Sequence, residues 1–185
     1  MLLLLACTAP PAGPDTAELD TGGESPALSV LYLSGESQYY DVDGVPVGRA
    51  SKQLLRRTVD PASATLEERV LEKSAGAVEE FTITAEIDPA GPTWTFGFDT
   101  GDGRIEGNGT FDEGETWEWT AWHSTSTLVG GSSDGWTILS EDRLDGDTFT
   151  AHKAFSDATG AAQGTTEEIL AVIDQETWDV AAAEW

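Results

Sequence analysis

The sequence predicts an all-β domain, an antiparallel up-and-down meander of about ten strands that forms a closed or partly open barrel. Two observations predict this fold class, and a physical argument favours its closure. Apolar and polar residues alternate along most runs of the chain, which is the period of a half-buried strand. Short turn signals rich in Asp, Gly and Pro separate these runs. Closing such a meander into a barrel removes the exposed edges that an open sheet would keep.

Length and charge limit the classes of protein that fit. With 185 residues, of which 39% are hydrophobic and seven are Trp, the chain suits one domain with a sizeable core and a short tail. The formal net charge of −25 excludes nucleic acid as a partner, because phosphate binding needs clustered Lys and Arg. Six of the nine basic residues nevertheless share one stretch, and we expect them on the outward faces of two adjacent strands, paired with acidic neighbours. These six are Arg49, Lys52, Arg56, Arg57, Arg69 and Lys73.

The chain begins with an apolar run, residues 1–7, that is too short to cross a bilayer as a helix but suits the apolar part of a secretion signal. Within it, Leu4-Leu5-Ala6-Cys7 resembles the lipobox of bacterial lipoproteins, and Cys7 is the only cysteine. The resemblance implies a diacylglycerol on Cys7, cleavage before it and anchoring in the cell envelope. Thr8 in the next position, where Asp is absent, is compatible with transfer to the outer membrane in such lipoproteins. Because no basic segment precedes the leucines, we expect the true start to lie upstream; a disordered apolar end is the alternative.

Residues 8–25 are rich in Pro, Gly and Thr, carry four acidic residues and have no apolar period. Such a segment does not bury enough apolar surface to offset the entropy of ordering, so it predicts a disordered acidic tether. The β-barrel-like domain then spans 26–185. Since the domain has no cysteine, its core must stabilise it without disulfides.

Strand-like runs follow one another through the domain. They cover 28–33, 47–59, 65–73, 78–87, 93–98, 104–111, 116–124, the hairpin 136–155, 165–173 and 177–185. The turn signals between them are Asp41–Gly44, Asp60–Ser63, Asp88–Pro92, Asp99–Gly103, Asp112–Gly114, the loop 130–135 and Asp145–Gly146. Asp145–Gly146 predicts a type I′ hairpin turn, because Asp-Gly tolerates positive φ angles. No run has a convincing helical period, but the apolar residues of 47–73 also fit helices, and this alternative stays open.

Alternation indicates which side chains face inward. The run 78–87 places Phe81, Ile83, Ala85 and Ile87 on one face. The second half of the hairpin places Phe149, Ala151, Lys153 and Phe155 on one face and Thr148, Thr150 and His152 on the other. We therefore expect the aromatic residues of the strands to pack into the barrel first.

The later half of the domain, from Trp117 to Trp178, is similar to the lipocalin-like or calycin group in its Trp-containing strands and Asp-Gly hairpins. The resemblance implies a cavity inside the barrel for a small apolar ligand, and barrels of this size often hold one ligand. The residues that we expect to line it are Trp94, Phe96, Trp117, Trp119, Trp136 and Phe149.

Three patterns raise the question of catalysis or metal binding. Gly131–Gly135 fits the Gly-x-Ser-x-Gly pattern of a hydrolase, with Ser133 as nucleophile and His123 or His152 as base, but a strand is predicted after it where that motif needs a helix. The two histidines with a carboxylate suit zinc, and one suits haem, yet no ligand spacing supports either. The acidic turns lack the spacing of a calcium loop. We therefore expect no metal, no cofactor and no catalysis.

The sequence thus favours a membrane-anchored lipoprotein of the bacterial cell envelope that binds a small apolar molecule or lipid in a β-barrel cavity. The alternative is a structural or protein-interaction module that offers its acidic surface to an envelope protein. An enzyme of unrecognised type is a third hypothesis.

Overall fold

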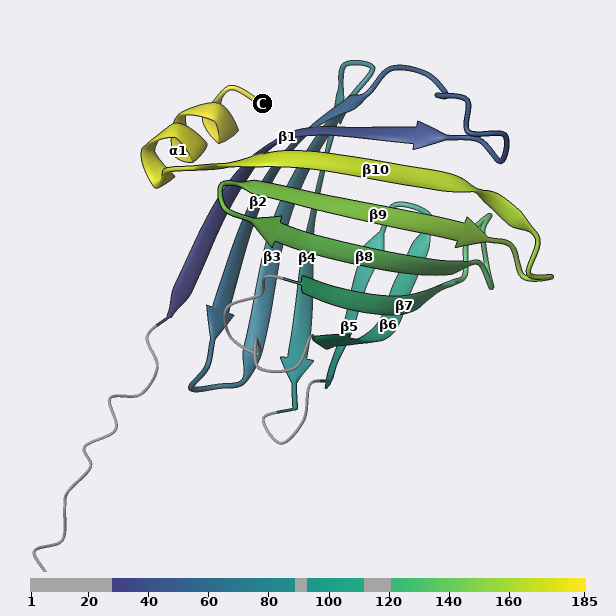
Figure 1. The fold of residues 1–185 in the computed structure, drawn as a ribbon, viewed down its shortest axis with the longest axis horizontal. Helices are drawn as coiled ribbons and strands as arrows, with labels where there is room; N and C mark the ends of the chain where they lie inside the picture. The colour runs from purple at the N-terminus through teal and green to yellow at the C-terminus, as the bar shows by residue number, and fades with distance from the viewer. Residues whose placement is uncertain (1–27, 89–92, 112–120) are drawn as a thin grey trace, which may run out of the picture.

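The computed structural model describes residues 28–88, 93–111 and 121–185. Within them, ten antiparallel strands form one closed barrel in which each strand pairs with its neighbours along the chain and β1 pairs with β10 (Figure 1). The strands are β1 (Ser29–Tyr40), β2 (Ser51–Asp60), β3 (Thr65–Ser74), β4 (Ala77–Ile87), β5 (Thr93–Thr100), β6 (Gly103–Phe111), β7 (Ala121–Val129), β8 (Thr137–Asp145), β9 (Thr148–Ser156) and β10 (Ala162–Ile173). The expectations for Cys7, the tether 8–25, the turn Asp112–Gly114, Trp117 and Trp119 lie outside the described residues.

The all-β antiparallel barrel predicted from the alternation is confirmed. The region 47–73, whose apolar residues also fitted helices, forms the two strands β2 and β3. Their inward residues alternate with outward ones, and Leu55 pairs directly with Val70 across the two strands. The expected turn after Asp41 is also present: its carboxylate accepts hydrogen bonds from the backbone of Asp43 and Val45, and Gly44 has a φ of 75°.

The β8–β9 hairpin turn differs by one residue from the expectation. Asp145 still belongs to β8 and pairs with Thr148, so Gly146 and Asp147 are the two central residues. Gly146 has a φ of 58°, and Asp147 is not among the residues with positive φ. Because a type I′ turn needs positive φ at both central positions, the predicted type is wrong; positive φ at the first position alone is the pattern of type II′.

The expected strand at 177–185 is wrong, because Gln175–Ala183 forms the helix α1. Asp174 caps its first turn, and the side-chain oxygen accepts a hydrogen bond of 2.7 Å from the backbone N–H of Thr177. Trp178 is the buried residue of the helix and packs on Leu54 and Leu71 against the outside of the barrel. Among the described residues, no helix has the length and apolar character that a membrane span requires.

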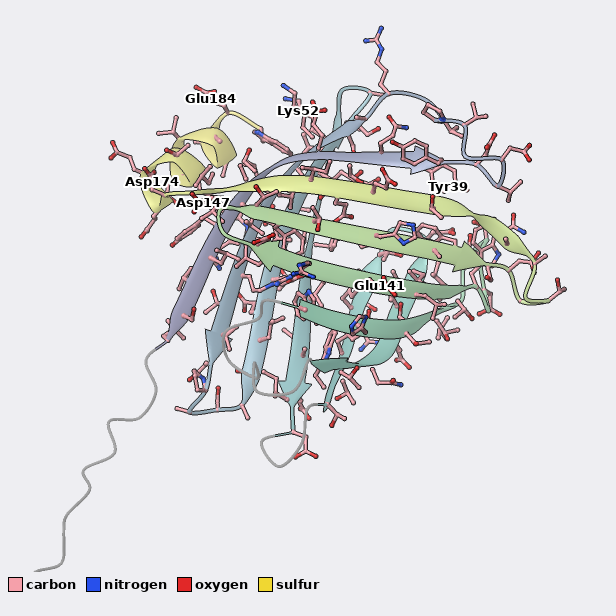
Figure 2. All side chains as sticks on the ribbon, in the orientation of Figure 1. Tyr39, Lys52, Glu141, Asp147, Asp174 and Glu184 are labelled. Carbon is pink, nitrogen blue, oxygen red and sulfur yellow. The ribbon has the colours of Figure 1, made fainter. Side chains whose placement is uncertain are left out.

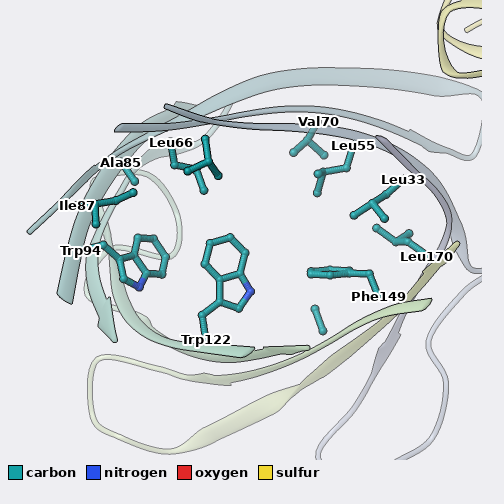
Figure 3. Close-up of a cluster of buried hydrophobic side chains, with 12 residues drawn as sticks. Leu33, Leu55, Leu66, Val70, Ala85, Ile87, Trp94, Trp122, Phe149 and Leu170 are labelled. Carbon is teal, nitrogen blue, oxygen red and sulfur yellow. The ribbon is translucent and has the colours of Figure 1, made fainter. Parts of the chain in front are cut away.

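A hydrophobic cluster fills one part of the interior. Figure 3 shows its side chains pointing inward from all around the barrel, with Trp94 and Trp122 beside each other. Their rings are 5.3 Å apart between centroids. The largest fully buried side chains of the cluster are those of Leu33, Leu66, Phe149 and Leu170. Val59, Leu66 and Phe149 place much of this cluster near the end of the barrel that carries the β2–β3 and β8–β9 turns, which we call the closed end.

The backbone pairing between β4 and β5 is the shortest in the described part of the barrel. Only Thr84–Ile87 of β4 pair with β5, whereas all ten residues of β3 pair with β4. Beyond the paired stretch, the rings of Phe81 and Phe98 stack at 5.4 Å between centroids. Side-chain packing therefore continues the wall where the backbone ladder stops.

Candidate ligand cavity

A cavity of about 770 Å³ lies inside the barrel, and residues from all ten strands line it. Its lining extends to Val47 and Arg49 in the β1–β2 loop and to Gly101 in the β5–β6 turn. We call this end of the barrel the mouth. The volume is within the roughly 300–1,000 Å³ of ordinary small-molecule sites. The cavity thus has the size and the enclosure of a site for one small organic molecule.

Aromatic side chains form much of the cavity wall. They come from strands on all sides and are Tyr39, Phe81, Trp94, Phe96, Phe98, Trp122, Phe149 and Phe155. Trp94 stacks on Phe96 at 4.8 Å between ring centroids, so these rings hold each other in place. Glycines of β6 make room for them: a Cβ added at Gly109 would overlap the ring of Trp94.

The structure brings three of the expected lining residues together. Trp94, Phe96 and Phe149 line the cavity. Trp136 does not, because it precedes β8 in the loop that follows β7, and Ile138 two residues later faces the cavity in its place.

A layer of five charged residues crosses the cavity, which the sequence analysis did not predict. The charged layer consists of Arg57, Glu68, Asp142, Lys153 and Glu168. On each strand the residue two positions nearer the closed end is apolar, as with Leu66 before Glu68 and Leu170 after Glu168. The layer therefore lies on the mouth side of Leu66 and Leu170. Two cluster members, Leu55 and Val70, lie nearer the mouth than the layer does.

Arg57 is the best-buried charged residue of this layer, with 2% of its surface exposed. Its Nε donates a hydrogen bond to Glu68, its register partner on β3. The guanidinium carbon is 3.5 Å from the ring centroid of Trp122 and 5.0 Å from that of Phe149, which are favourable cation–π positions. Its Nη1 has no hydrogen-bond acceptor in the described part of the chain. This corrects the expectation that all six clustered basic residues face outward.

The other clustered cations bear out that expectation in part. Arg56 pairs with Glu67 at 3.2 Å, and Arg69 pairs with Glu80 at 2.7 Å, both on the outer face. Arg57 follows Arg56 directly, so strand alternation turns it inward, together with Leu55. The position of Arg57 two residues after Leu55 is the signal from which an inward arginine could have been predicted.

Lys153 and Glu168 form the second ion pair of the charged layer. Lys153 faces the cavity as the alternation of Phe149, Ala151 and Phe155 predicted, and a third of its side chain remains accessible. Burial lowers the pKa of Lys153, but the negative charges of Glu168 and Asp142 outweigh burial, and the pKa of Lys153 is raised overall. Lys153 therefore stays protonated.

Asp142 is the carboxylate of the layer that forms no ion pair within the described part of the chain. The Ser140 hydroxyl donates a hydrogen bond of 2.7 Å to it. Burial raises the pKa of Asp142 to about 6, against the opposing effects of Lys153 and Arg57. Because Asp142 lines the cavity, its charge is available to a molecule inside the barrel.

The two histidines lie outside the cavity. His123 of β7 and His152 of β9 are exposed, and both pair in register with Glu141 of β8, which Figure 2 shows on the outer surface. Within the described residues, no three His, Cys, Asp or Glu side chains are arranged to hold a metal ion. The segment Gly131–Gly135 forms the β7–β8 loop and leads into a strand, so the strand-to-helix setting of a nucleophile elbow is absent there.

The acidic turn Asp99–Gly103 is tied to a neighbouring loop. Asp102 accepts a hydrogen bond of 2.9 Å from the backbone N–H of Ser132, and a second from its hydroxyl. These bonds lower the pKa of Asp102. The carboxylate thus joins the β5–β6 turn to the β7–β8 loop at the mouth.

Comparison with known proteins finds no matching protein-family model, no matching curated protein and no matching solved structure. The case for function therefore rests on the cavity.

Proposed function

We propose that this protein binds one small organic molecule inside its β-barrel and that binding, not catalysis, is its activity. The observation that carries the proposal is the cavity of about 770 Å³ with eight aromatic side chains in its lining. An enclosed site with aromatic walls and a few polar groups is the usual form of a small-molecule site. A protein that needed only a stable barrel would gain more from filling this space with side chains.

The lining supports an amphipathic ligand more than a wholly apolar one. Phe81, Phe96 and Phe98 offer apolar surface to the cavity, whereas the charged layer offers hydrogen-bonding groups to it. A wholly apolar molecule in contact with the layer would desolvate Asp142 and Lys153 without compensation. We therefore extend the expectation of an apolar ligand to a molecule with an apolar body and a polar end.

We also propose that the protein is a lipoprotein anchored in the bacterial envelope, in the outer membrane, through Cys7. The lipobox-like sequence at residues 4–7 and the acidic tether 8–25 support this. The test is metabolic labelling with an alkyne fatty acid in a bacterial host. The wild-type chain should take up the label and sediment with membranes, and Cys7→Ser should do neither. Equal labelling of both chains would refute the anchor.

Native mass spectrometry tests the binding function. The full chain carrying Cys7→Ser, which removes the anchor, is purified from the bacterium of origin without detergent. We expect an added mass that is lost on denaturation. A matched pair of variants locates it: Ser124→Trp fills the cavity, whereas Thr125→Trp adds the same ring to the outer face of the same strand. The added mass should disappear only when Ser124→Trp is introduced into the Cys7→Ser chain. If the Cys7→Ser chain and its Thr125→Trp variant both lack an added mass, an interaction module is favoured.

A further inference from the structure

We infer that the ligand is an organic cation: an amine or quaternary ammonium group with an aromatic or apolar body, its charge bound by Asp142. The inference rests on the proposed binding function and names the ligand class for the same cavity. It follows from the charges of the layer, the aromatic wall and the acidic mouth.

One carboxylate of the charged layer has no cation partner within the layer. Two cations face three carboxylates, and each cation has its own partner: Arg57 pairs with Glu68, and Lys153 pairs with Glu168. Asp142 accepts a hydrogen bond from a hydroxyl group and forms no ion pair with any residue that the structure describes. An enclosed carboxylate of this kind is costly unless a positive charge compensates it. A ligand cation beside Asp142 would make the layer neutral.

The ring faces beside the layer suit a cation as well. Trp122 is the register partner of Asp142, and its ring already makes a cation–π contact with the guanidinium of Arg57. The stacked rings of Phe96 and Phe98, 6.5 Å apart between centroids, line the same cavity. Rings attract cations through their negative faces, and the attraction strengthens where water is excluded. The interior therefore provides both the charge and the aromatic contacts that bind ammonium groups.

The mouth favours entry of cations. Glu72 and Glu79 line the cavity near its mouth and pair in register across β3 and β4, and neither belongs to an ion pair among the described residues. Arg49 is the basic residue of the lining at this end. With a formal charge of −25 on the whole chain, the field attracts cations and repels anions.

An anionic ligand fits these charges poorly, although Arg57 has unused donors. Its Nη1 is covered by protein, and its positive charge is already matched by Glu68. A carboxylate placed there would lie among Glu68, Asp142 and Glu168. Adding a fourth negative charge to three in one enclosed site is unfavourable.

The experiment compares three probes that share one aromatic body: 1-naphthylmethylammonium, the neutral 1-naphthylmethanol and the anion 1-naphthylacetate. Isothermal titration calorimetry at pH 7.5 and low salt measures each against the full chain carrying Cys7→Ser. We expect the ammonium to bind at least about tenfold tighter than the alcohol, as one close charge pair supports, and the anion to bind weakest. Asp142→Asn should reduce this ratio to within about threefold, mainly by weakening ammonium binding.

Glu141→Gln is the matched control, because it removes one negative charge from the adjacent position on the outer face of the same strand. The ratio of ammonium to alcohol affinity in Glu141→Gln should equal that of the Cys7→Ser chain with Glu141 intact. Alcohol that still binds to Asp142→Asn shows that this variant keeps the cavity. If the alcohol or the anion binds as tightly as the ammonium, or if Asp142→Asn keeps the full preference, the cation inference is wrong and binding stands. If none of the three probes binds, the cation inference is wrong, and the added mass in native mass spectrometry decides the binding function separately.

Discussion

Arg57 of β2 and Trp122 of β7 lie on opposite walls of the barrel, five strands apart in either direction, and meet across its interior. The guanidinium carbon is 3.5 Å from the ring centroid. This contact, with the Glu68 ion pair, ties three strands together through the middle of the cavity. It also positions a permanent positive charge within the same layer as Asp142.

Replacing Arg57 with Met should destabilise the protein strongly. Glu68 is 7% exposed and would be left as an unpaired buried charge, a loss of about 3–5 kcal/mol in the free energy of unfolding. Arg56→Met is the control, because Arg56 pairs with Glu67 on the outer face, where such a pair contributes about 1 kcal/mol or less. Urea denaturation followed by Trp fluorescence measures both. Equal losses would mean that the interior ion pair has no special role.

Asp142→Asn should stabilise the protein at neutral pH. The pKa of Asp142 is about 6 in the folded state against its ordinary value of 3.8, so the folded state binds more protons between these values. Its contribution to stability is present below pH 3.8 and is lost as the pH rises through 6. At pH 7 the variant should gain about 1–3 kcal/mol, and at pH 4 it should gain nothing. Denaturation at both pH values tests this, and a gain independent of pH would contradict it.

Trp178→Ala should detach α1 from the barrel. Trp178 is 3% exposed and packs on Leu54 and Leu71, so its loss should cost about 3–5 kcal/mol. Val180→Ala on the exposed side of the same helix should change stability by less than about 0.5 kcal/mol. Thermal melting compares them. Because the helix lies outside the barrel, binding of 1-naphthylmethanol should survive Trp178→Ala below the melting temperature; loss of binding would link α1 to the cavity.

Gly35→Ala should separate β1 from β10 locally. A Cβ at Gly35 would overlap the carbonyl oxygen of Ile169 and crowd the backbone of Leu170, its register partner. Backbone cannot rotate aside as a side chain does, so we expect a loss of about 1–3 kcal/mol. Gly101→Ala in the β5–β6 turn has open space around the new methyl group and should be near neutral. A Gly35→Ala barrel as stable as the parent would disprove this close approach.

Much of the fold was predictable because the signal is local. Phe81, Ile83, Ala85 and Ile87 alternate with polar residues, and each is at least partly buried on the inner face of β4. The α1 helix was missed because it is short and gains most of its stability from docking Trp178. Asp174 three residues before Thr177 was the one local sign of a helix start.

The candidate site was predictable only in its aromatic part. Trp94, Phe96 and Phe149 followed from alternation on strands. The charged layer did not follow, because a charged residue on a strand is ordinarily assigned to the solvent face. Arg57 faces inward since Glu68 and Trp122 are there to receive it, and both come from other strands.

The sequence by itself determined that this protein is an antiparallel β-barrel with aromatic residues inside, since the period of two and the turn residues act between near neighbours. Only the tertiary structure decided that Arg57, Asp142 and Lys153 meet in one cavity. Their positions depend on closure of β1 onto β10 and on the strand register around the barrel, which join residues far apart in the chain. The balance of two cations against three carboxylates is therefore a property of the closed barrel.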